Sequence, residues 1–328
     1  MYDPDPHGLL ESRLAVCRYY ANKNIHVSPE QIFLTAGSSE AYNFLFRLLA
    51  DPGELVLAPK PGYPLFDYLS DLNDIQQIKY PLIYTGAWRI DMAKLETLLK
   101  ERPRALIFVN PGNPTGNFVS KSEREAANKL CRNSDTALIS DEVFLDFIWN
   151  TKDNSPASFA GNNEVLTFSL GGVSKMLGLP QMKVSWIVVS GPEPAKQEAI
   201  KKLEVISDTY LSVNTSSQRA LPFWFSRQQE IAEEIRQRVL HNLAYLEKKM
   251  NELKNVRVMH AEGGWQAILE ARASSLNDEE TVLRLLEEKN VLIHPGYFFD
   301  LADGNFFVLS LLLPPQNFQE AVDRLSFV

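Results

Sequence analysis

The sequence predicts a three-layer α/β/α fold with a mostly parallel central sheet, followed by a smaller C-terminal α+β domain. Near-continuous apolar segments alternate with helical patterns through the first two-thirds of the 328 residues. That alternation is typical of parallel strands that are buried on both faces. A long amphipathic segment follows, and short strands interspersed with helices come after it. This change of pattern indicates a second, smaller domain.

The strands of the large domain are short apolar runs bounded by turn residues. In chain order we expect them at 31–35, 54–58, 105–109, 137–140, 165–169 and 184–189. A helix is expected at 38–50, where Asp51-Pro52-Gly53 ends it, and another at 121–132.

The segment 226–253 predicts one long helix, because apolar residues recur along it at helical spacing. Its apolar stripe consists of Ile231, Ile235, Val239, Leu243, Leu246, Met250 and Leu253. After it we expect strands at 256–259 and 265–270, a helix at 279–289, a strand at 308–312 and a final helix. We therefore expect a large domain over 1–228 and a small C-terminal domain over 229–328.

The composition argues against several classes of function. The net charge is -8 and there is no basic block, which disfavours a nucleic-acid partner. Cys17 and Cys131 form no CxxC pair and the five histidines show no ligand spacing, so we expect neither a disulfide framework nor a metal site. This cysteine usage favours a reducing, cytoplasmic location. No apolar run approaches the ~18 residues of a membrane span, and the polar start is no secretory signal.

Polar residues follow several expected strands, and ligands collect at the carboxyl ends of strands in open α/β sheets. Lys175 lies in a Gly-rich segment, predicted to be a loop, after the strand that ends near Ser169. It stands between Gly171-Gly172 and apolar residues, and a partly buried lysine can lose its proton and attack an aldehyde. The ordinary alternative is a solvated surface charge.

Two further segments follow neighbouring strands. Asp141 closes the strand 137–140, where a buried carboxylate needs a cation such as a protonated pyridine nitrogen. The alternative for Asp141 is a helix N-cap. Asn113 lies in the turn-rich segment 110–116, from which its amide could donate to a phenolate oxygen. The alternative for Asn113 is a plain tight turn.

Two weaker signals come from the first strands. Ser38 and Ser39 precede a helix, whose free N–H groups and dipole attract an anion, although such residues also serve as ordinary caps. Tyr63, in Pro61-Gly62-Tyr63-Pro64, could stack on a planar heterocycle or simply pack.

Together these segments resemble the class I and II aminotransferases, which use pyridoxal 5′-phosphate. The likeness runs from Tyr2 to the C-terminus. The segments around Asn113, Asp141 and Lys175 stand in the family's order, 28 and 34 positions apart. The resemblance implies that Lys175 forms the Schiff base with the cofactor and shuttles protons. It also implies that Asp141 pairs with the pyridine nitrogen, that Asn113 donates to the ring oxygen and that Tyr63 stacks on the ring.

The resemblance also implies a phosphate site. Ser38 and Ser39 fall in the family's phosphate-contacting turn, and Lys183 stands where the family usually has a phosphate-binding arginine. Tyr2 matches a tyrosine that the family sends to the phosphate of the neighbouring subunit. A homodimer with a shared active site is therefore expected.

This sequence departs from the family pattern at several positions. Phe144 replaces a tyrosine that donates to the ring oxygen, which should raise the pKa of the Schiff base, and Gly172 replaces a serine. Val308 stands where an arginine usually binds the substrate carboxylate. The segment before Tyr2 is shorter than in the family, which suggests a truncated chain, an alternative start or a degraded copy.

The resemblance implies amino transfer between a small amino acid and a keto acid, with ping-pong kinetics. Two alternatives stay open, a β-lyase that uses the same lysine and aspartate, and a non-catalytic binding module that keeps the fold. A dehydrogenase is disfavoured because no GxGxxG turn follows the first strand.

Overall fold

The computed structural model describes residues 4–149, 158–253, 255–271, 277–301 and 304–325. Within them, one sheet has the strand order β1-β8-β7-β6-β5-β2-β3-β4. Its strands are β1 Ile32–Thr35, β2 Leu55–Lys60, β3 Gln76–Tyr84, β4 Trp88–Ile90, β5 Ala105–Val109, β6 Ala137–Asp141, β7 Thr167–Gly172 and β8 Ser185–Ser190. Parallel pairing joins β3, β2, β5, β6 and β7, whereas β8 is antiparallel to both neighbours and β4 to β3. The predicted, mostly parallel sheet is confirmed.

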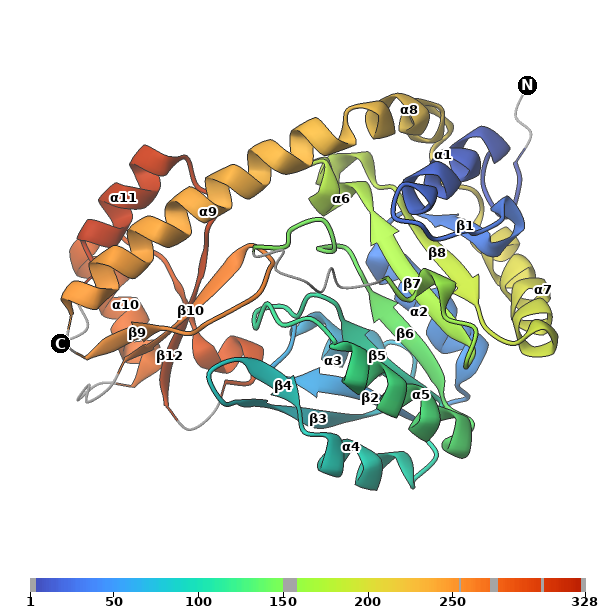
Figure 1. Ribbon diagram of the computed structural model, residues 1–328, viewed down its shortest axis with the longest axis horizontal. Helices are drawn as coiled ribbons and strands as arrows, with labels where there is room; N and C mark the ends of the chain where they lie inside the picture. The colour runs from blue at the N-terminus through green and yellow to red at the C-terminus, as the bar shows by residue number, and fades with distance from the viewer. Residues whose placement is uncertain (1–3, 150–157, 254, 272–276, 302–303, 326–328) are drawn as a thin grey trace.

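Helices cover both faces of this sheet (Figure 1). One face packs against α2 Ser38–Leu49, α3 Leu65–Asp71 and α7 Glu193–Tyr210. The other face packs against α4 Met92–Leu99 and α5 Lys121–Ser134 towards one end, and against α1 Leu10–Ala21 and α8 Thr215–Ser226 towards the other. Every residue of β5, β6 and β8 is therefore buried, which explains why these strands read as continuous apolar runs.

A second sheet lies at the far end of the long helix α9 Gln228–Glu252 (Figure 1). Its strand order is β11-β12-β10-β9, and every pairing in it is antiparallel. The strands are β9 Val256–Val258, β10 Gln266–Ala271, β11 His294–Pro295 and β12 Asn305–Ser310. Helix α9 packs on this sheet with α10 Asp278–Lys289 and α11 Pro315–Asp323. The division of the chain near residue 228 stays a prediction.

Several elements differ from the sequence-based expectation. The helix expected from residue 226 begins at Gln228, and Arg227 separates it from α8. The strand expected at 308–312 is β12, which starts at Asn305. Strand β3 was missed because only Tyr80 and Leu82 of its 9 residues are buried, so it lacks the long apolar run by which the other strands were recognised. Helix α1 was missed because its buried side includes Ser12 and Arg13 as well as apolar residues, which breaks the apolar stripe.

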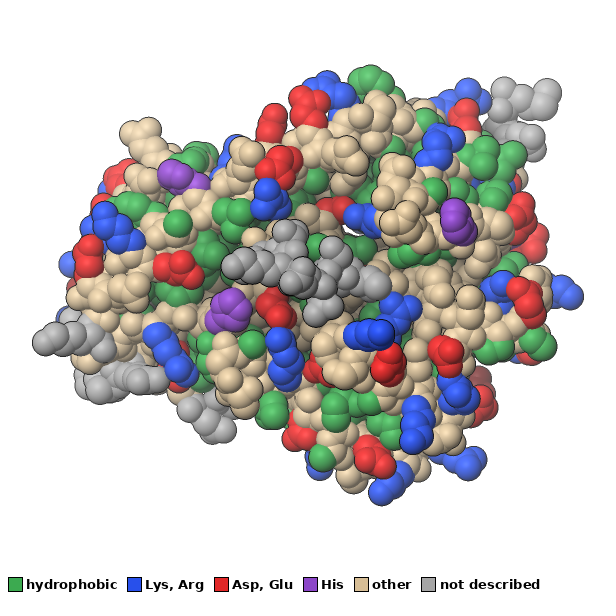
Figure 2. Space-filling view, viewed as in Figure 1, with side chains coloured by type: hydrophobic (Ala, Val, Ile, Leu, Met, Phe, Trp, Pro, Cys, Tyr) green, Lys and Arg blue, Asp and Glu red, His purple; other side chains and the backbone are tan. Residues whose placement is uncertain are grey.

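Basic and acidic side chains are interspersed over the face of the molecule shown in Figure 2. In the part of the chain that the structure describes, no helix has both the length and the apolar character needed to cross a membrane.

Gly171 offers a test of the packing between β7 and β8. A Cβ at this position would lie 2.4 Å from a ring carbon of Trp186, which is fully buried. Gly171→Ala should therefore lower the free energy of unfolding by about 1–3 kcal/mol in a denaturant titration. Gly161→Ala is the matched control, since its nearest atom would be Ile25 Cγ2 at 3.4 Å. Equal losses in the two variants would contradict this account of the packing.

Candidate functional site

Three segments meet at the carboxyl edge of β5, β6 and β7. The loop after β5 begins at Asn110, whose N–H donates to the Asp141 carbonyl at 2.8 Å. Asp141 is the last residue of β6 and pairs in register with Leu170 of β7. Helix α6 Val173–Met176, which contains Lys175, follows β7 directly. The parallel order of the strands thus brings to one edge the segments that carry Asn113, Asp141 and Lys175.

The Asp141 carboxylate is buried and held by two donors. The Tyr42 hydroxyl donates to its Oδ2 at 3.1 Å, and the Val143 N–H donates to its Oδ1 at 3.2 Å. Burial raises its pKa from 3.8 to about 6, although both donors and the nearby Lys175 charge lower it. Among the described residues no cation lies within ion-pair distance of this carboxylate. A buried acid in this condition favours a cationic ligand.

The interpretation of Asp141 as a helix N-cap is wrong. Residues 142–149 form turns and an isolated bridge rather than a helix.

Lys175 lies on the short helix α6, so the predicted Gly-rich loop at this position is wrong. The side chain is partly buried, and its Nζ lies 5.8 Å from the Phe144 ring centroid and 5.7 Å from that of Trp265. These two rings contact each other edge to face, with centroids 5.4 Å apart. The amine therefore stands beside an aromatic wall, which limits its contact with water.

Trp265 was missed by the sequence analysis. It precedes β10 of the second sheet and contacts Phe147 of the segment after β6, with ring centroids 5.0 Å apart. The chain reaches this position through Gly263, where a Cβ would lie 2.5 Å from the Phe147 carbonyl oxygen, and Gly264, whose N–H donates to that oxygen at 2.9 Å. A Gly-Gly step before a strand indicates such a close backbone approach and was the available signal.

Asn113 and Tyr63 lie in the loops after β5 and β2. Asn113 is partly buried, and its Oδ1 is a buried atom with no hydrogen-bond partner among the described residues. Tyr63 is 42% exposed. Its loop is held by the Gly62 N–H, which donates to the Phe299 carbonyl at 3.0 Å. Asn113 thus leaves a polar atom unsatisfied, and Tyr63 leaves an aromatic ring largely open.

The structure brings Lys183 to the start of helix α2, although 145 positions separate it from Ser38. A Cβ on Gly37, the residue before α2, would lie 3.5 Å from Lys183 Nζ. The side chain of Lys183 forms no ion pair or hydrogen bond with the described residues. A cation beside the positive end of a helix is repelled, and an anion bound there would reverse that effect. Ser38, Ser39 and Lys183 therefore form a candidate anion site.

Two other residues singled out from the sequence, Tyr2 and Val308, are not among the residues that the structure brings together here. Tyr2 falls outside the described residues. Val308 is buried in β12, opposite Ile268 and His294, and packs in the apolar cluster that also covers the α4 and α5 face of the large sheet. Position 308 therefore provides a buried, uncharged side chain and no group that could pair with a carboxylate.

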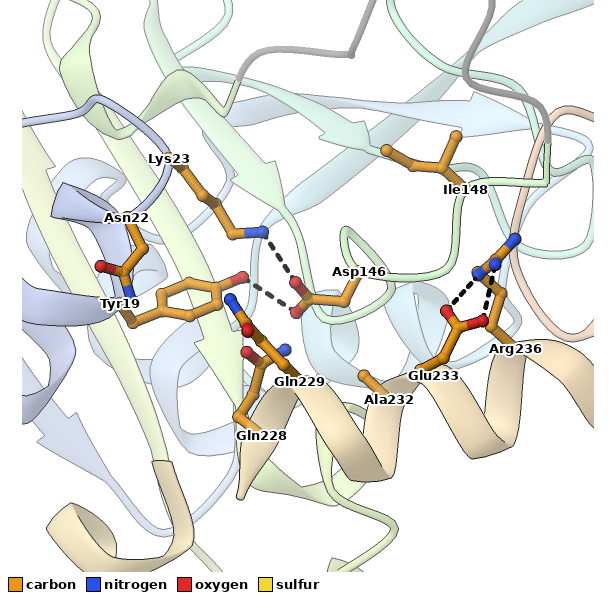
Figure 3. Close-up of a pocket in the computed structure, with 10 residues that line it drawn as sticks. All are labelled: Tyr19, Asn22, Lys23, Asp146, Ile148, Gln228, Gln229, Ala232, Glu233 and Arg236. Atoms are coloured by element: carbon orange, nitrogen blue, oxygen red, sulfur yellow. Dashed lines mark hydrogen bonds and ion pairs between the residues drawn. The ribbon is translucent and has the colours of Figure 1, made fainter. Parts of the chain in front are cut away.

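A cavity of about 440 Å³ lies between α1, the segment after β6 and α9 (Figure 3). Tyr19 of α1 and Lys23, in the turn after that helix, point toward Asp146, whose carboxylate accepts from them at 3.0 and 2.7 Å. Across the cavity, Glu233 and Arg236 pair along α9 at 2.7 Å. Asp146 thus anchors to α1 the same segment that carries Asp141 and Phe144, a role that the sequence analysis missed.

Comparisons with known proteins agree on one family. The family model for aminotransferase class I and II matches residues 3–325. An alanine aminotransferase from Mycobacterium tuberculosis is 27% identical, over 98% of this chain and 76% of that protein. An S-alkyl-thiohydroximate lyase from Arabidopsis thaliana is 28% identical, over 97% of this chain and 70% of that protein. The solved alanine aminotransferase from Pyrococcus furiosus superposes with a TM-score of 0.91 at 25% identity, over 98% and 82% of the two chains.

Because the pKa of Asp141 is raised, we predict that replacing this residue increases the free energy of unfolding of the cofactor-free protein, and that the increase depends on pH. A carboxyl whose folded-state pKa is raised contributes stability below about pH 4 that is lost as pH rises through 6. Relative to the wild type, Asp141→Asn should therefore gain about 3 kcal/mol of unfolding free energy between pH 4 and pH 7.5.

Urea titrations across this pH range would measure the difference. Asp71→Asn, at an exposed position on α3, is the control for loss of a surface carboxylate. A difference between wild type and Asp141→Asn that stays constant with pH would contradict the prediction.

Proposed function

The chain belongs to the class I and II aminotransferase family, and on that premise we propose that it is a pyridoxal-5′-phosphate-dependent aminotransferase acting on a small amino acid and a keto acid. The observation that carries the proposal is that one edge of the sheet brings together the amine of Lys175 and the buried carboxylate of Asp141, on which the Lys175 charge acts. We also propose that the large domain, 1–228, binds the cofactor and that 229–328 covers it through Trp265.

The described residues fit this cofactor at both of its ends. Asp141 supplies a buried acid for a protonated ring nitrogen, and we assign the side-chain NH2 group of Asn113 to donate to the ring oxygen. Lys183, with Ser38 and Ser39 at the start of α2, supplies an unpaired cation and free N–H groups for the phosphate. Lysine holds phosphate as a point charge, so these serines and backbone groups have to orient it.

When bound, pyridoxal phosphate supplies an aldehyde and an electron-withdrawing ring that weaken the bonds at the α-carbon of an amino acid. Lys175 Nζ is the amine that we assign to hold the aldehyde and, once released, to move a proton. Asp141 keeps a proton on the ring nitrogen, and Asn113 orients the ring oxygen. Phe144 and Trp265 shield the amine of Lys175 from water. Phe144 has no hydroxyl, so it cannot donate to the ring oxygen.

We propose that the active unit is a homodimer in which Tyr2 of a second copy reaches the phosphate. We assign the open face of Tyr63 to stacking on the ring. Val308 places no positive charge at the second sheet, so the substrate carboxylate has to be bound by other groups.

Elimination is the second candidate function, and one observation favours it. A relative that is 28% identical is named as a lyase. Both reactions need the same lysine and aspartate, so their products separate them.

The function is tested by incubating wild type and Lys175→Ala with pyridoxal phosphate and then with a panel of amino acids. We expect the wild type to show a visible absorption band that shifts with one amino acid, and to release a keto acid in proportion to the amino group transferred. Ammonia and pyruvate from a β-substituted amino acid would indicate the lyase instead. Lys175→Ala should show no borohydride-stable link to the cofactor by mass spectrometry. A link retained in this variant would overturn the assignment.

Lys183 predicts a separate effect on phosphate binding. Lys183→Ala should weaken the affinity for pyridoxal phosphate about tenfold, because it removes a charge-assisted contact. It should leave the affinity for pyridoxal, which lacks the phosphate, nearly unchanged. Lys201→Ala, at an exposed position on α7, is the matched control. Equal losses for both ligands would show that Lys183 does not bind the phosphate.

A further inference from the structure

We propose that Tyr42 is a positioning residue for Asp141, and that its buried hydroxyl holds this carboxylate ionised and in one orientation for the ring nitrogen of the cofactor. The inference rests on the function proposed above and deepens it.

The contact is direct and buried. Tyr42 is 2% exposed on α2, and its hydroxyl donates to Asp141 Oδ2 at 3.1 Å. The other oxygen of the carboxylate, Oδ1, accepts from the Val143 N–H at 3.2 Å. Each oxygen therefore has one donor, which fixes the plane of the carboxylate and leaves lone pairs for a ligand. A hydrogen bond to an ionised acceptor is stronger than one between neutral groups.

The Tyr42 ring is itself held in place. It packs edge to face on Phe66, with centroids 5.2 Å apart, and contacts Phe46 at 5.8 Å. Burial and the neighbouring Asp141 raise the pKa of Tyr42 well above its usual value of 10. The hydroxyl therefore keeps its proton, and it acts as a donor throughout the neutral range.

The other charged and titratable groups do not replace this donor. The charge of Lys175, from α6, lowers the pKa of Asp141, but we assign the amine of Lys175 to hold the cofactor. Tyr80 of β3 helps to raise the pKa of Tyr42, but its own hydroxyl donates to the Ile107 carbonyl at 2.8 Å. The neighbouring Glu142 carboxylate accepts from Ser140, Ser158 and the Phe159 N–H instead. Tyr42 is thus the side-chain donor that stays with Asp141 once Lys175 is engaged.

Helix α2 links both ends of the site. Ser38 opens the helix at the candidate anion site, and Tyr42 lies four residues later, one turn along the same side. One rigid element would thereby set the spacing between the phosphate turn and the acid. The plainer explanation is a buried tyrosine that satisfies its hydroxyl, which predicts lost stability and no change in the ionisation of Asp141.

The test compares pyridoxal phosphate affinity between pH 5 and pH 8.5 in wild type and Tyr42→Phe, which keeps the ring packing. Losing the donor should move the acidic midpoint of binding upward by about one pH unit. At pH 6 such a shift lowers the ionised fraction of Asp141 about fivefold, so affinity should fall by a similar factor and recover at high pH. In an Asp141→Asn background, Tyr42→Phe should shift nothing further.

Tyr20→Phe is the matched control, because it removes another buried hydroxyl, one that accepts from Trp186 at 3.1 Å. It should leave the midpoint unchanged. An unchanged midpoint in Tyr42→Phe overturns the inference but leaves the proposed function standing. Absence of binding by the wild type overturns both. If Tyr42→Phe fails to fold, a fluorotyrosine at position 42, which is a stronger donor of nearly the same shape, should move the midpoint downward, and an unmoved midpoint overturns the inference.

Discussion

A buried carboxylate with no cation within ion-pair distance, among the residues that the structure describes, is the constraint on which this site depends. Asp141 ends a strand whose residues are all buried, and burial raises its pKa to about 6. Two neutral donors hold it, and neither neutralises its charge. A ligand with a positively charged ring nitrogen would therefore bind favourably here, because its charge would offset the free-energy cost of burying the carboxylate. This arrangement explains why an acid is kept where an apolar residue would pack more easily.

The rest of the fold brings the other residues of the candidate site close to Asp141. The parallel strands β5, β6 and β7 bring the Asn113 loop, Asp141 and Lys175 to one edge. The second sheet reaches the same place through two glycines and contributes Trp265. Asp146 ties the segment after Asp141 to α1, beside the cavity on the α9 side. The acid, the amine and the aromatic side chains beside the amine therefore come from different elements, each of which is held in place by its own contacts.

The sequence predicted those parts of the site that lie directly after apolar strands. Asn113, Asp141 and Lys175 could be found because each follows such a strand, and parallel strands end at a common edge. Contacts between distant segments could not be found in this way. Tyr42 lies 99 positions from Asp141, and nothing in a helical pattern tells which buried residue meets a particular acid. The short helix at Lys175 was missed as well, because glycines around a four-residue helix give the pattern of a loop.

The pairing of Asp141 with a ring nitrogen is tested most directly by a cofactor analogue that has carbon in place of that nitrogen. Affinities for pyridoxal phosphate and for the deaza analogue would be measured in wild type and Asp141→Asn at pH 7.5. We expect the wild type to prefer pyridoxal phosphate by about tenfold or more, because a charged hydrogen bond is lost with the analogue, and the variant to lose that preference. The same preference in both proteins would contradict the account.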